Sequence, residues 1–484
     1  MFLQLDARGP QYLQLARALK QAILDGRCAP GSRLPATRAL ARELDISRNT
    51  ALAAYALLSE EGLIEGRSGS GCYVAAFVAM PKRTPAAVVQ TPARAPALSR
   101  RGQRMLTVYD RAIPGRQHRG LRYNLQYGLP MTNPQLAGAW RRALNQAAAR
   151  VQADYPDPQG LPGLRAQICG YLARRRGISA VPDDVLVVNG TQQAFALAAE
   201  VLLDAGDGMI LEDPHYQGAR QVFAARGAMI RTCRVDAAGL VTAELPVDGR
   251  VRLAVVTPSH QFPTGAVLSL PRRMQLLDWA QRRHAWLIED DYDGEFRYGA
   301  RPLAALKSLD RAGRVIYVGS FSKVIFPALR LGYMVLPASL REAMVAAKWL
   351  TDRGSTAIEQ AALAHLIGSG AFERHLRRAA IVLRARRSAL LGALQRLLGD
   401  AIEVADSSAG MHILVWLPHT SHAQAQTLVE RARARGVGVY LVAPYCHKLR
   451  KRPGLLLGYA DLPPADLLAA VRILADCLSQ IRSG

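Results

Sequence analysis

A lysine stands among phosphate-binding residue types in the stretch VGSFSKVIFPALRLGY, residues 318–333. Lys323 follows Ser320 and Ser322, and Arg330 lies seven positions beyond it. A lysine amine forms an imine with an aldehyde, whereas hydroxyl and guanidinium groups bind phosphate. The spacing therefore indicates a site for a phosphorylated aldehyde, with Lys323 as the imine lysine and the two serines and Arg330 as phosphate ligands.

Two other stretches supply groups for an aromatic ring. In WLIEDDYDGEF, Asp290 and Tyr292 end a predicted strand, where ligand-binding residues of an open sheet belong. A carboxylate there keeps a pyridine nitrogen protonated, and the phenol faces a ring hydroxyl. In EDPHYQGA, Tyr216 follows another predicted strand and is placed to stack on the ring.

The stretch NGTQQAF follows a predicted strand and opens a helix. Backbone N–H groups at a helix N-terminus bind phosphate. Gly190, Thr191 and Gln192 are therefore further candidate ligands. Each of these stretches is also common as a plain turn or surface element, but their joint order is difficult to assign to chance.

A second kind of chemistry is indicated near residue 48, in LDISRNTALAAYALL. Ser47 is placed to cap a helix whose first residues are Arg48, Asn49 and Thr50. In a helix-turn-helix these positions face base edges, where arginine suits guanine and asparagine suits adenine. The alternative is a small three-helix module that binds protein.

Helical spacing and caps predict three helices, at about 12–24, 37–44 and 48–61, followed by a hairpin around a Gly/Ser turn. Together they make a winged helix-turn-helix over residues 1–79. Residues 80–119 are rich in Pro, Ala and Arg, without a sustained helical or strand period, which is typical of a linker.

Residues 120–484 alternate apolar strands with helices, a pattern that predicts a largely parallel sheet covered on both faces, followed by a smaller α+β portion. The five strands that we expect are VLVVNG, GMILED, LAVVTP, WLIEDD and VIYVGS.

The chain of 484 residues carries a formal net charge of +24, which favours a polyanionic partner. Residues 1–79 hold nine Lys/Arg and seven Asp/Glu, whereas residues 80–123 hold ten and one. The basic linker is either a non-specific DNA contact or a solubilising spacer. Six scattered cysteines argue against a zinc site or a disulfide scaffold, and we expect no metal. Without a signal peptide or membrane span, we expect a cytoplasmic protein.

The chain resembles known families over nearly its whole length. Residues 10–75 resemble a GntR-type winged helix, and residues 120–484 resemble a fold-type I aminotransferase domain through YPDPQGLPGLR, NGTQQAF, EDPHYQG, SHQFPTG, EDDYDGEFRY and GSFSKVIFPALRLGY. The fused pair resembles the MocR/GabR subfamily of transcription regulators. The resemblance implies pyridoxal 5′-phosphate as the cofactor and a double-stranded DNA operator as a partner.

The resemblance also implies further site residues. In the GntR pattern Arg33 and Arg38 meet phosphates or groove edges, and Arg67 and Gly69 of the wing approach the backbone or minor groove. In the aminotransferase pattern Tyr155 reaches the cofactor phosphate of a partner subunit, so we expect a homodimer. The MocR-type dimer is head-to-tail.

Two positions depart from the aminotransferase pattern. Phe262 replaces an asparagine beside the ring hydroxyl, where His260 or Gln261 can compensate. Leu456, in GLLLGYA, replaces the arginine that binds a substrate carboxylate. Without that guanidinium a carboxylate lacks its bidentate anchor, so we expect weak or absent transaminase activity.

We therefore expect a transcription regulator that senses pyridoxal phosphate, or an amine or amino-acid effector, through a lysine aldimine. The alternatives are an active aminotransferase that carries a DNA-binding domain, and a regulator whose large domain has lost the cofactor.

Overall fold

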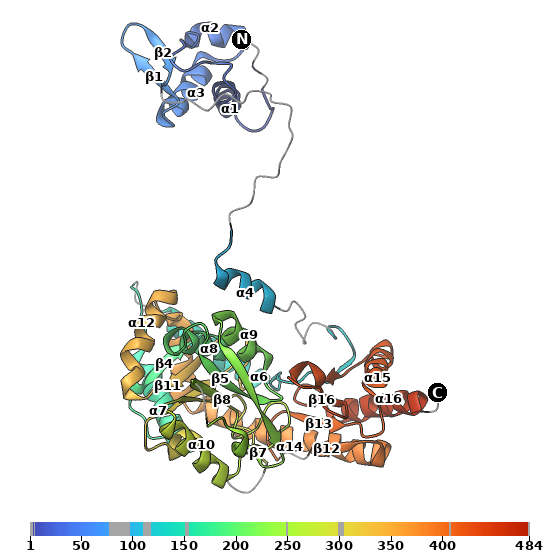
Figure 1. Ribbon diagram of the computed structural model, residues 1–484. Coiled ribbons are helices and arrows are strands. Elements are labelled where there is room, and N and C mark those ends of the chain that lie inside the picture. The colour runs from blue at the N-terminus through green and yellow to red at the C-terminus, as the bar shows by residue number, and fades with distance from the viewer. Residues whose placement is uncertain are drawn as a thin grey trace. The chain divides into compact units, whose positions relative to one another are not determined.

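The computed structural model describes residues 3, 5–76, 97–109, 118–150, 154–247, 250–298, 304–405 and 408–482. The chain forms two compact units, Met1–Ala97 and Leu98–Gly484. The smaller unit carries the N-terminus and the larger one the C-terminus (Figure 1).

The smaller unit is the winged helix-turn-helix that the sequence predicts. Its elements are α1 (Gln11–Leu24), α2 (Thr37–Glu43), α3 (Arg48–Glu60), β1 (Ile64–Arg67) and β2 (Gly71–Val74). The two strands pair antiparallel as the wing. Helix α3 starts where Ser47 accepts a hydrogen bond from Thr50 N at 3.0 Å, so the predicted cap is confirmed.

A helix lies within the predicted linker. Helix α4 (Arg100–Val108) is capped by Ser99 and packs against α9 (Gln217–Arg226), so the expectation of irregular structure over residues 80–119 is wrong for this part. Nine residues are too few for a stable isolated helix, and the tertiary contacts that support α4 lie more than a hundred residues away. The remaining residues 80–96 and 110–117 lie outside the described residues.

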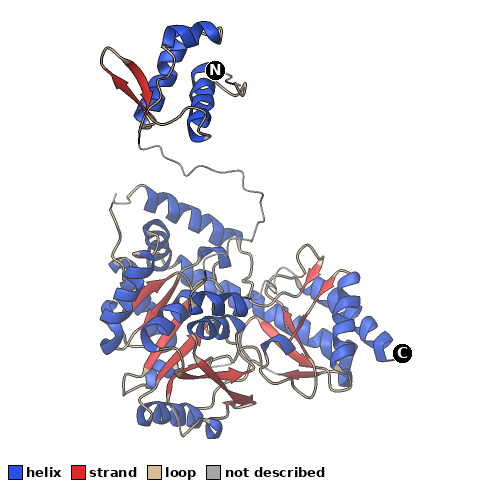
Figure 2. Ribbon diagram, turned by 45° about the horizontal axis from the view of Figure 1, so that its top comes forward, coloured by secondary structure: helices blue, strands red, loops and turns tan. Residues whose placement is uncertain are grey.

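The larger unit is built on an eight-stranded sheet, visible among the helices in Figure 2. Its strand order is β4-β11-β10-β9-β8-β5-β6-β7. The central pairs from β10 to β6 are parallel, and β11 and β7 pair antiparallel. The strands are β4 (Val185–Val188), β5 (Gly208–Asp213), β6 (Met229–Asp236), β7 (Gly239–Leu240), β8 (Val251–Val256), β9 (Trp286–Asp291), β10 (Val315–Ser320) and β11 (Gly332–Val335). All five predicted strands are present.

Helices cover both faces of this sheet, as the near-continuous apolar strands predict. One face packs on α8 (Thr191–Leu202), α9 and α12 (Arg341–Asp352). The other face packs on α7 (Pro162–Arg176), α10 (Leu270–Arg282) and α13 (Ala357–Gly368). Helices α6 (Pro134–Ala148) and α11 (Leu306–Leu309) complete this part.

The predicted smaller α+β portion follows α14 (Ala371–Leu398). Its antiparallel sheet has the order β12-β13-β16-β15, with helices α15 (His422–Ala434) and α16 (Pro464–Arg482). The strands are β12 (Glu403–Ala405), β13 (His412–Trp416), β15 (Tyr440–Leu441) and β16 (Gly454–Gly458). A short parallel pair, β3 (Tyr123–Asn124) and β14 (Val437–Gly438), joins the start of the large unit to this portion.

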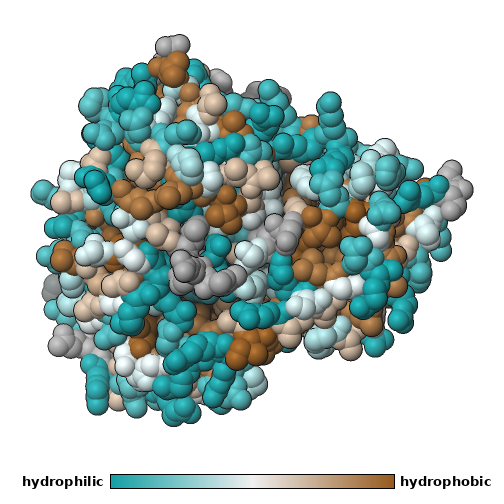
Figure 3. Space-filling model, turned by 90° about the horizontal axis from the view of Figure 1, so that it is seen from below, coloured by the Kyte–Doolittle hydropathy of each residue, from teal (hydrophilic) through white to brown (hydrophobic). Residues whose placement is uncertain are grey.

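Hydrophilic side chains cover much of the face seen in Figure 3, and apolar residues gather there in small groups. Within the described ranges no helix has both the length and the apolar character needed to cross a membrane.

Candidate functional site

A pocket opens where β4, β9 and β10 end and where α8 and α9 begin. The wall is assembled from segments spread from residue 127 to residue 412. The pocket is lined by Tyr127, Gly128, Thr191, Tyr216, Phe262, Asp290, Tyr292, Asp293, Lys323, Met411 and His412. The structure therefore brings the predicted residues Lys323, Asp290, Tyr292, Tyr216 and Thr191 together in one pocket.

The amine of Lys323 is held against the backbone. Its Nζ donates a hydrogen bond to the carbonyl oxygen of Gly128 at 2.9 Å. A Cβ added at Gly128, where φ is +74°, would lie 2.7 Å from Nζ, so this approach requires glycine. Burial lowers the pKa of Lys323, which favours the neutral amine that attacks an aldehyde.

The two adjacent acids of β9 have different surroundings because successive side chains of a strand point to opposite faces. Asp291 pairs with Arg176 at 2.7 Å and accepts a hydrogen bond from Tyr317. Asp290 instead lines the pocket. Burial, and to a smaller extent the neighbouring carboxylates, raises its pKa to about 8. Its Oδ1 atom is buried without a hydrogen-bond partner among the described residues. A cationic ring nitrogen would supply the missing partner.

Helix α8 points its first backbone N–H groups toward the pocket without a side-chain cap. Its N-cap is Gly190, with φ of +82°. The guanidinium of Arg330 packs against this glycine and donates to the carbonyl of Asn189 at 2.9 Å. A Cβ at Gly190 would lie 3.3 Å from that guanidinium. The helix end and the arginine therefore form a cradle for an anion.

The two serines before the lysine are both buried. Ser320 Oγ accepts a hydrogen bond from Ser322 N at 3.2 Å. Ser322 Oγ is buried with no partner in the described part of the chain, so its hydroxyl is available to a ligand. The side chain of Gln192 donates from Nε2 to Gly218 O at 3.2 Å and does not line this pocket.

Aromatic side chains enclose the space between the lysine and the acid. The rings of Tyr216 and Phe262 meet edge to face with centroids 6.1 Å apart. The hydroxyl of Tyr292 lies 2.9 Å from His260 Nδ1. The side chain of Gln261 is committed elsewhere, to Glu212 and two backbone carbonyls. Of His260 and Gln261, the two residues expected to compensate for Phe262, only His260 therefore contacts Tyr292.

Sequence reasoning missed five residues of the pocket wall, which are Tyr127, Gly128, Asp293, Met411 and His412. His260 Nδ1 lies 2.8 Å from Asp293 Oδ2, and both side chains are buried. His412 lies beside them, and these three side chains offer ligand atoms within 4.8 Å of one another. Tyr127 and Met411 complete the wall. Apart from Asp293, which lies in WLIEDDYDGEF, no motif marks these residues, because they come from distant segments that meet only in the folded chain.

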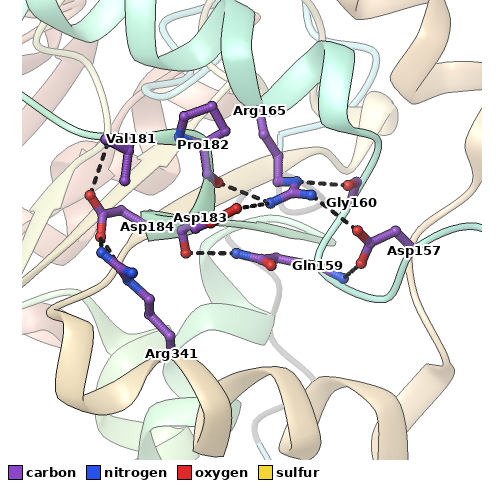
Figure 4. Close-up of polar contacts among 9 residues, drawn as sticks. All are labelled: Asp157, Gln159, Gly160, Arg165, Val181, Pro182, Asp183, Asp184 and Arg341. Atoms are coloured by element: carbon purple, nitrogen blue, oxygen red, sulfur yellow. Dashed lines mark hydrogen bonds and ion pairs between the residues drawn. The ribbon is translucent and has the colours of Figure 1, made fainter.

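Tyr155 does not line this pocket and is 72% exposed. The loop that follows it is fixed by Arg165, which donates to Gly160 O at 3.0 Å and to Asp157 Oδ2 at 3.0 Å (Figure 4). Arg165 also bonds Pro182 O at 3.1 Å, so the loop is tied to the start of β4. An exposed aromatic side chain thus stands beside a rigid loop.

The described residues fit pyridoxal phosphate. Among the described residues, Asp290 Oδ1 and Ser322 Oγ have no hydrogen-bond partner, and α8 has no side-chain cap at the end where the phosphate would lie. These unpaired groups match a pyridinium and a phosphate, and Lys323 supplies the amine between them.

The DNA-reading residues predicted in the smaller unit are accessible. Ser47, Arg48 and Asn49 are exposed at the start of α3, and Thr50 is half-buried. The hydroxyl of Tyr55 donates to Pro35 O at 2.7 Å, which holds the segment before α2 against α3.

The remaining predicted DNA contacts lie on the wing and beside it. Arg33, Arg38, Arg67 and Gly69 are exposed. The guanidinium of Arg67 lies 4.5 Å from the ring centroid of Tyr73, and Arg33 bridges to the same strand. The wing therefore presents basic side chains that are held by its own residues.

Comparison with protein families agrees with both units. Residues 11–74 match the bacterial regulatory proteins of the gntR family, and residues 126–474 match aminotransferase class I and II. One similar solved structure is the α-aminoadipate aminotransferase LysN of Thermus thermophilus, in complex with N-(5′-phosphopyridoxyl)-L-leucine. It matches with a TM-score of 0.71 and 28% sequence identity, over 80% of this chain and 98% of that chain.

Curated relatives share the whole arrangement. The probable rhizopine catabolism regulatory protein MocR of Rhizobium meliloti is 34% identical over 100% of this chain and 97% of its own length. The regulator TauR of Rhodobacter capsulatus is 33% identical over 99% of this chain and 98% of its own length. The chain therefore belongs to the MocR-type transcription regulators, in which a gntR-family winged helix is fused to an aminotransferase class I and II domain.

Proposed function

We propose that this regulator holds pyridoxal phosphate at Lys323 and uses it to sense either the cofactor itself or an amine effector. The observation that carries the proposal is the buried Oδ1 of Asp290, without a partner among the described residues, in the same pocket as the half-buried Lys323. Pyridoxal phosphate, when bound, supplies an aldehyde carbon for reversible capture of amines.

The residues of the pocket divide the work. Lys323 is desolvated and keeps its amine available for exchange with another amine. Asp290 holds a proton on the ring nitrogen, and the start of α8 with Arg330 anchors the phosphate. Tyr216 and Phe262 exclude water from one side.

Helix α4 provides the route from this pocket toward DNA. Arg104 donates to the carbonyls of Ala225 and Arg226, at 3.3 Å each, at the end of α9. Arg101 pairs with Glu200 near the end of α8 at 3.0 Å. Helices α8 and α9 both begin in the pocket, so α4 is tied to the far ends of the two helices that a ligand touches. The chain runs from α4 to the winged helix, and a shift of α8 or α9 thereby biases the DNA-binding unit.

We also propose that the protein acts as a head-to-tail homodimer, in which the exposed Tyr155 completes the phosphate site of the partner subunit. Support comes from its exposure and from the rigid loop beside it. Tyr155→Phe should weaken cofactor retention without changing the fold, as measured by dialysis of the loaded protein.

The function is tested by reducing the cofactor-loaded full-length protein with borohydride and mapping the modified peptide. We expect one pyridoxyl group, on Lys323. Attachment at another lysine, or none, contradicts the proposal. Turnover with amino acids and 2-oxo acids separates a regulator from a working aminotransferase, and we expect a rate well below about 1 s⁻¹.

A further inference from the structure

The pocket is acidic once its lysine is engaged. Of its two acids, Asp290 is taken up by the ring nitrogen in the proposed function, which leaves Asp293 to face a ligand, and Lys323 is the only basic amine or guanidinium among the described lining residues. Burial lowers the pKa of His412 to about 4, so this imidazole is neutral near pH 7. A ligand in this space therefore meets negative charge and neutral polar groups.

Four arginines that lie near Leu456 in sequence or near the pocket make other contacts. Arg450 donates to the carbonyl of Asp213, and Arg452 pairs with Glu403. Arg330 lies against Gly190 in the phosphate cradle. Arg220 lines a second, outer cavity, together with Thr107 and Gln426. None of the four lines the inner pocket.

The side chains of the C-terminal sheet that pack behind Phe262 are largely apolar. Leu456 is fully buried on β16, with Leu414 of β13 and Tyr440 of β15 as its register neighbours. These side chains form one cluster with Phe262, which lines the pocket. The position from which a longer basic side chain would extend toward the pocket is thus occupied by leucine.

Asp293 retains capacity for another hydrogen bond. Its Oδ2 accepts from His260 Nδ1 at 2.8 Å, and its side chain is 2% exposed. An ionised carboxylate has about four acceptor positions, so a donor from a bound molecule has a place there. A hydroxyl or an ammonium group satisfies this carboxylate, whereas another carboxylate is repelled by it.

We infer that the effector is a primary amine that lacks a carboxylate on its amine-bearing carbon and carries a hydroxyl or second amine that donates to Asp293. The inference rests on the proposed function, since the amine must reach the cofactor at Lys323. An α-carboxylate would lose its hydration beside the acid of Asp293, with no guanidinium among the described lining residues to bind it, a cost that a hydroxyl does not carry.

The test uses L-alanine and L-alaninol, which differ only in a carboxylate against a hydroxymethyl group. Each is titrated into the pyridoxal-phosphate-loaded, full-length protein, and the change in visible absorbance gives its apparent Kd. We expect L-alaninol to bind at least about tenfold more tightly, since an unpaired buried charge costs more than about 1.4 kcal/mol. Equal binding, or tighter binding of L-alanine, overturns the inference.

Substitutions at two positions locate the preference. Leu456→Arg introduces a guanidinium behind Phe262 and should shift the ratio toward L-alanine by about tenfold or more, whereas Leu456→Gln, polar but uncharged, should not reverse it. Asp293→Asn tests the same preference without placing an arginine in the core. It should reduce the preference for L-alaninol over L-alanine because it removes the repelling charge. Cofactor loading of each variant is confirmed first by its absorbance.

The outcomes separate this inference from the proposed function. A preference for L-alanine with a normal amine response contradicts only the effector class. No response to either compound in a protein that loads pyridoxal phosphate overturns amine sensing, and with it this inference, and leaves the cofactor as the signal. An unchanged ratio in Asp293→Asn contradicts the role of that carboxylate.

Discussion

The two functional regions of this regulator differ in how their residues are assembled. The predicted DNA contacts fall between Arg33 and Gly69, and most of them are exposed. The cofactor pocket draws on residues from Tyr127 to His412, and all of its described lining residues except Tyr216 are buried or half-buried. A local, exposed site is set by one supersecondary motif, whereas the buried site depends on the packing of two sheets and several helices.

This difference changes what a charge does in each region. Exposed arginines of the winged helix are solvated, so their interactions with DNA phosphates are screened by salt. In the pocket, burial raises the pKa of Asp290 and lowers those of Lys323 and His412. Substitutions in the pocket should therefore act through protonation and desolvation, and substitutions in the winged helix through contacts with bases and phosphates.

The largest effect is expected at Lys323. Lys323→Ala removes the amine that links the cofactor, so borohydride should leave no covalently bound pyridoxyl group. Mass spectrometry of the reduced, full-length protein measures this. The matched control is Lys20→Ala, which removes an exposed lysine that pairs with Glu61 and should leave labelling complete. Residual labelling of Lys323→Ala at a single site would contradict the assignment.

The next effect is a pH dependence due to Asp290. The pKa of Asp290 in the folded protein without cofactor is about 8, whereas its ordinary value is 3.8. Between these values the folded state keeps a proton that the unfolded chain has released, so the stabilising contribution is full below about pH 4 and is lost as pH rises toward 8. The free energy of unfolding of the unloaded protein should fall across this window.

Asp290→Asn removes this titration and should flatten the fall, as measured by denaturant unfolding at several pH values. Glu212 and Glu289 are also buried, with pKa values raised to about 7, so the informative quantity is the difference between variant and parent. An identical slope in both proteins would show that Asp290 does not titrate in this range.

The pocket also shows what sequence could and could not predict. Lys323, Asp290 and Thr191 stand at strand ends or helix starts, which are visible as an apolar run followed by a turn or a helix pattern. Asp293 lies within the stretch WLIEDDYDGEF, but only the folded chain brings it beside His260 and His412. Met411 and Tyr127 follow no motif, since a residue in a wall needs only the right volume and place.

Helix α4 was not predicted because its support is tertiary. Prolines at 92, 96 and 114 favour irregular structure, and the nine helical residues between them have no apolar core of their own. The winged helix was predicted almost completely, since its helix caps, turn glycines and apolar periods lie within one continuous stretch.

Arg48 tests the exposed site. Arg48→Ala removes a fork that can bind a guanine edge, so we expect a loss of about 1–3 kcal/mol of binding free energy and relaxed discrimination at one base pair. Selection of binding sites from a random DNA pool, with the full-length protein, measures both. Arg27→Ala, an exposed arginine of the same unit outside the predicted contacts, is the control and should keep the sequence preference. Unchanged preference in Arg48→Ala would remove this residue from base recognition.

The smallest expected effect joins the two regions. Arg104 holds α4 to the end of α9 through two neutral carbonyls, so Arg104→Ala should cost only about 1 kcal/mol of stability. Its effect on communication should be clearer. The cofactor absorbance should respond to ligand as in the parent, while the difference in DNA affinity between loaded and unloaded protein shrinks.

Arg100→Ala is the matched control for this experiment. It removes the same charge from the first turn of the same helix, where the side chain is exposed. If helix α4 acts through its attachment to α9, only Arg104→Ala reduces the ligand-dependent change in DNA affinity. If both variants weaken DNA binding equally, and with the same loss of salt dependence, then the helix acts as a basic contact for phosphates and not as a link to the pocket. The two results distinguish mechanical coupling from non-specific attraction, because only coupling requires that the pocket and the DNA-binding unit report on each other.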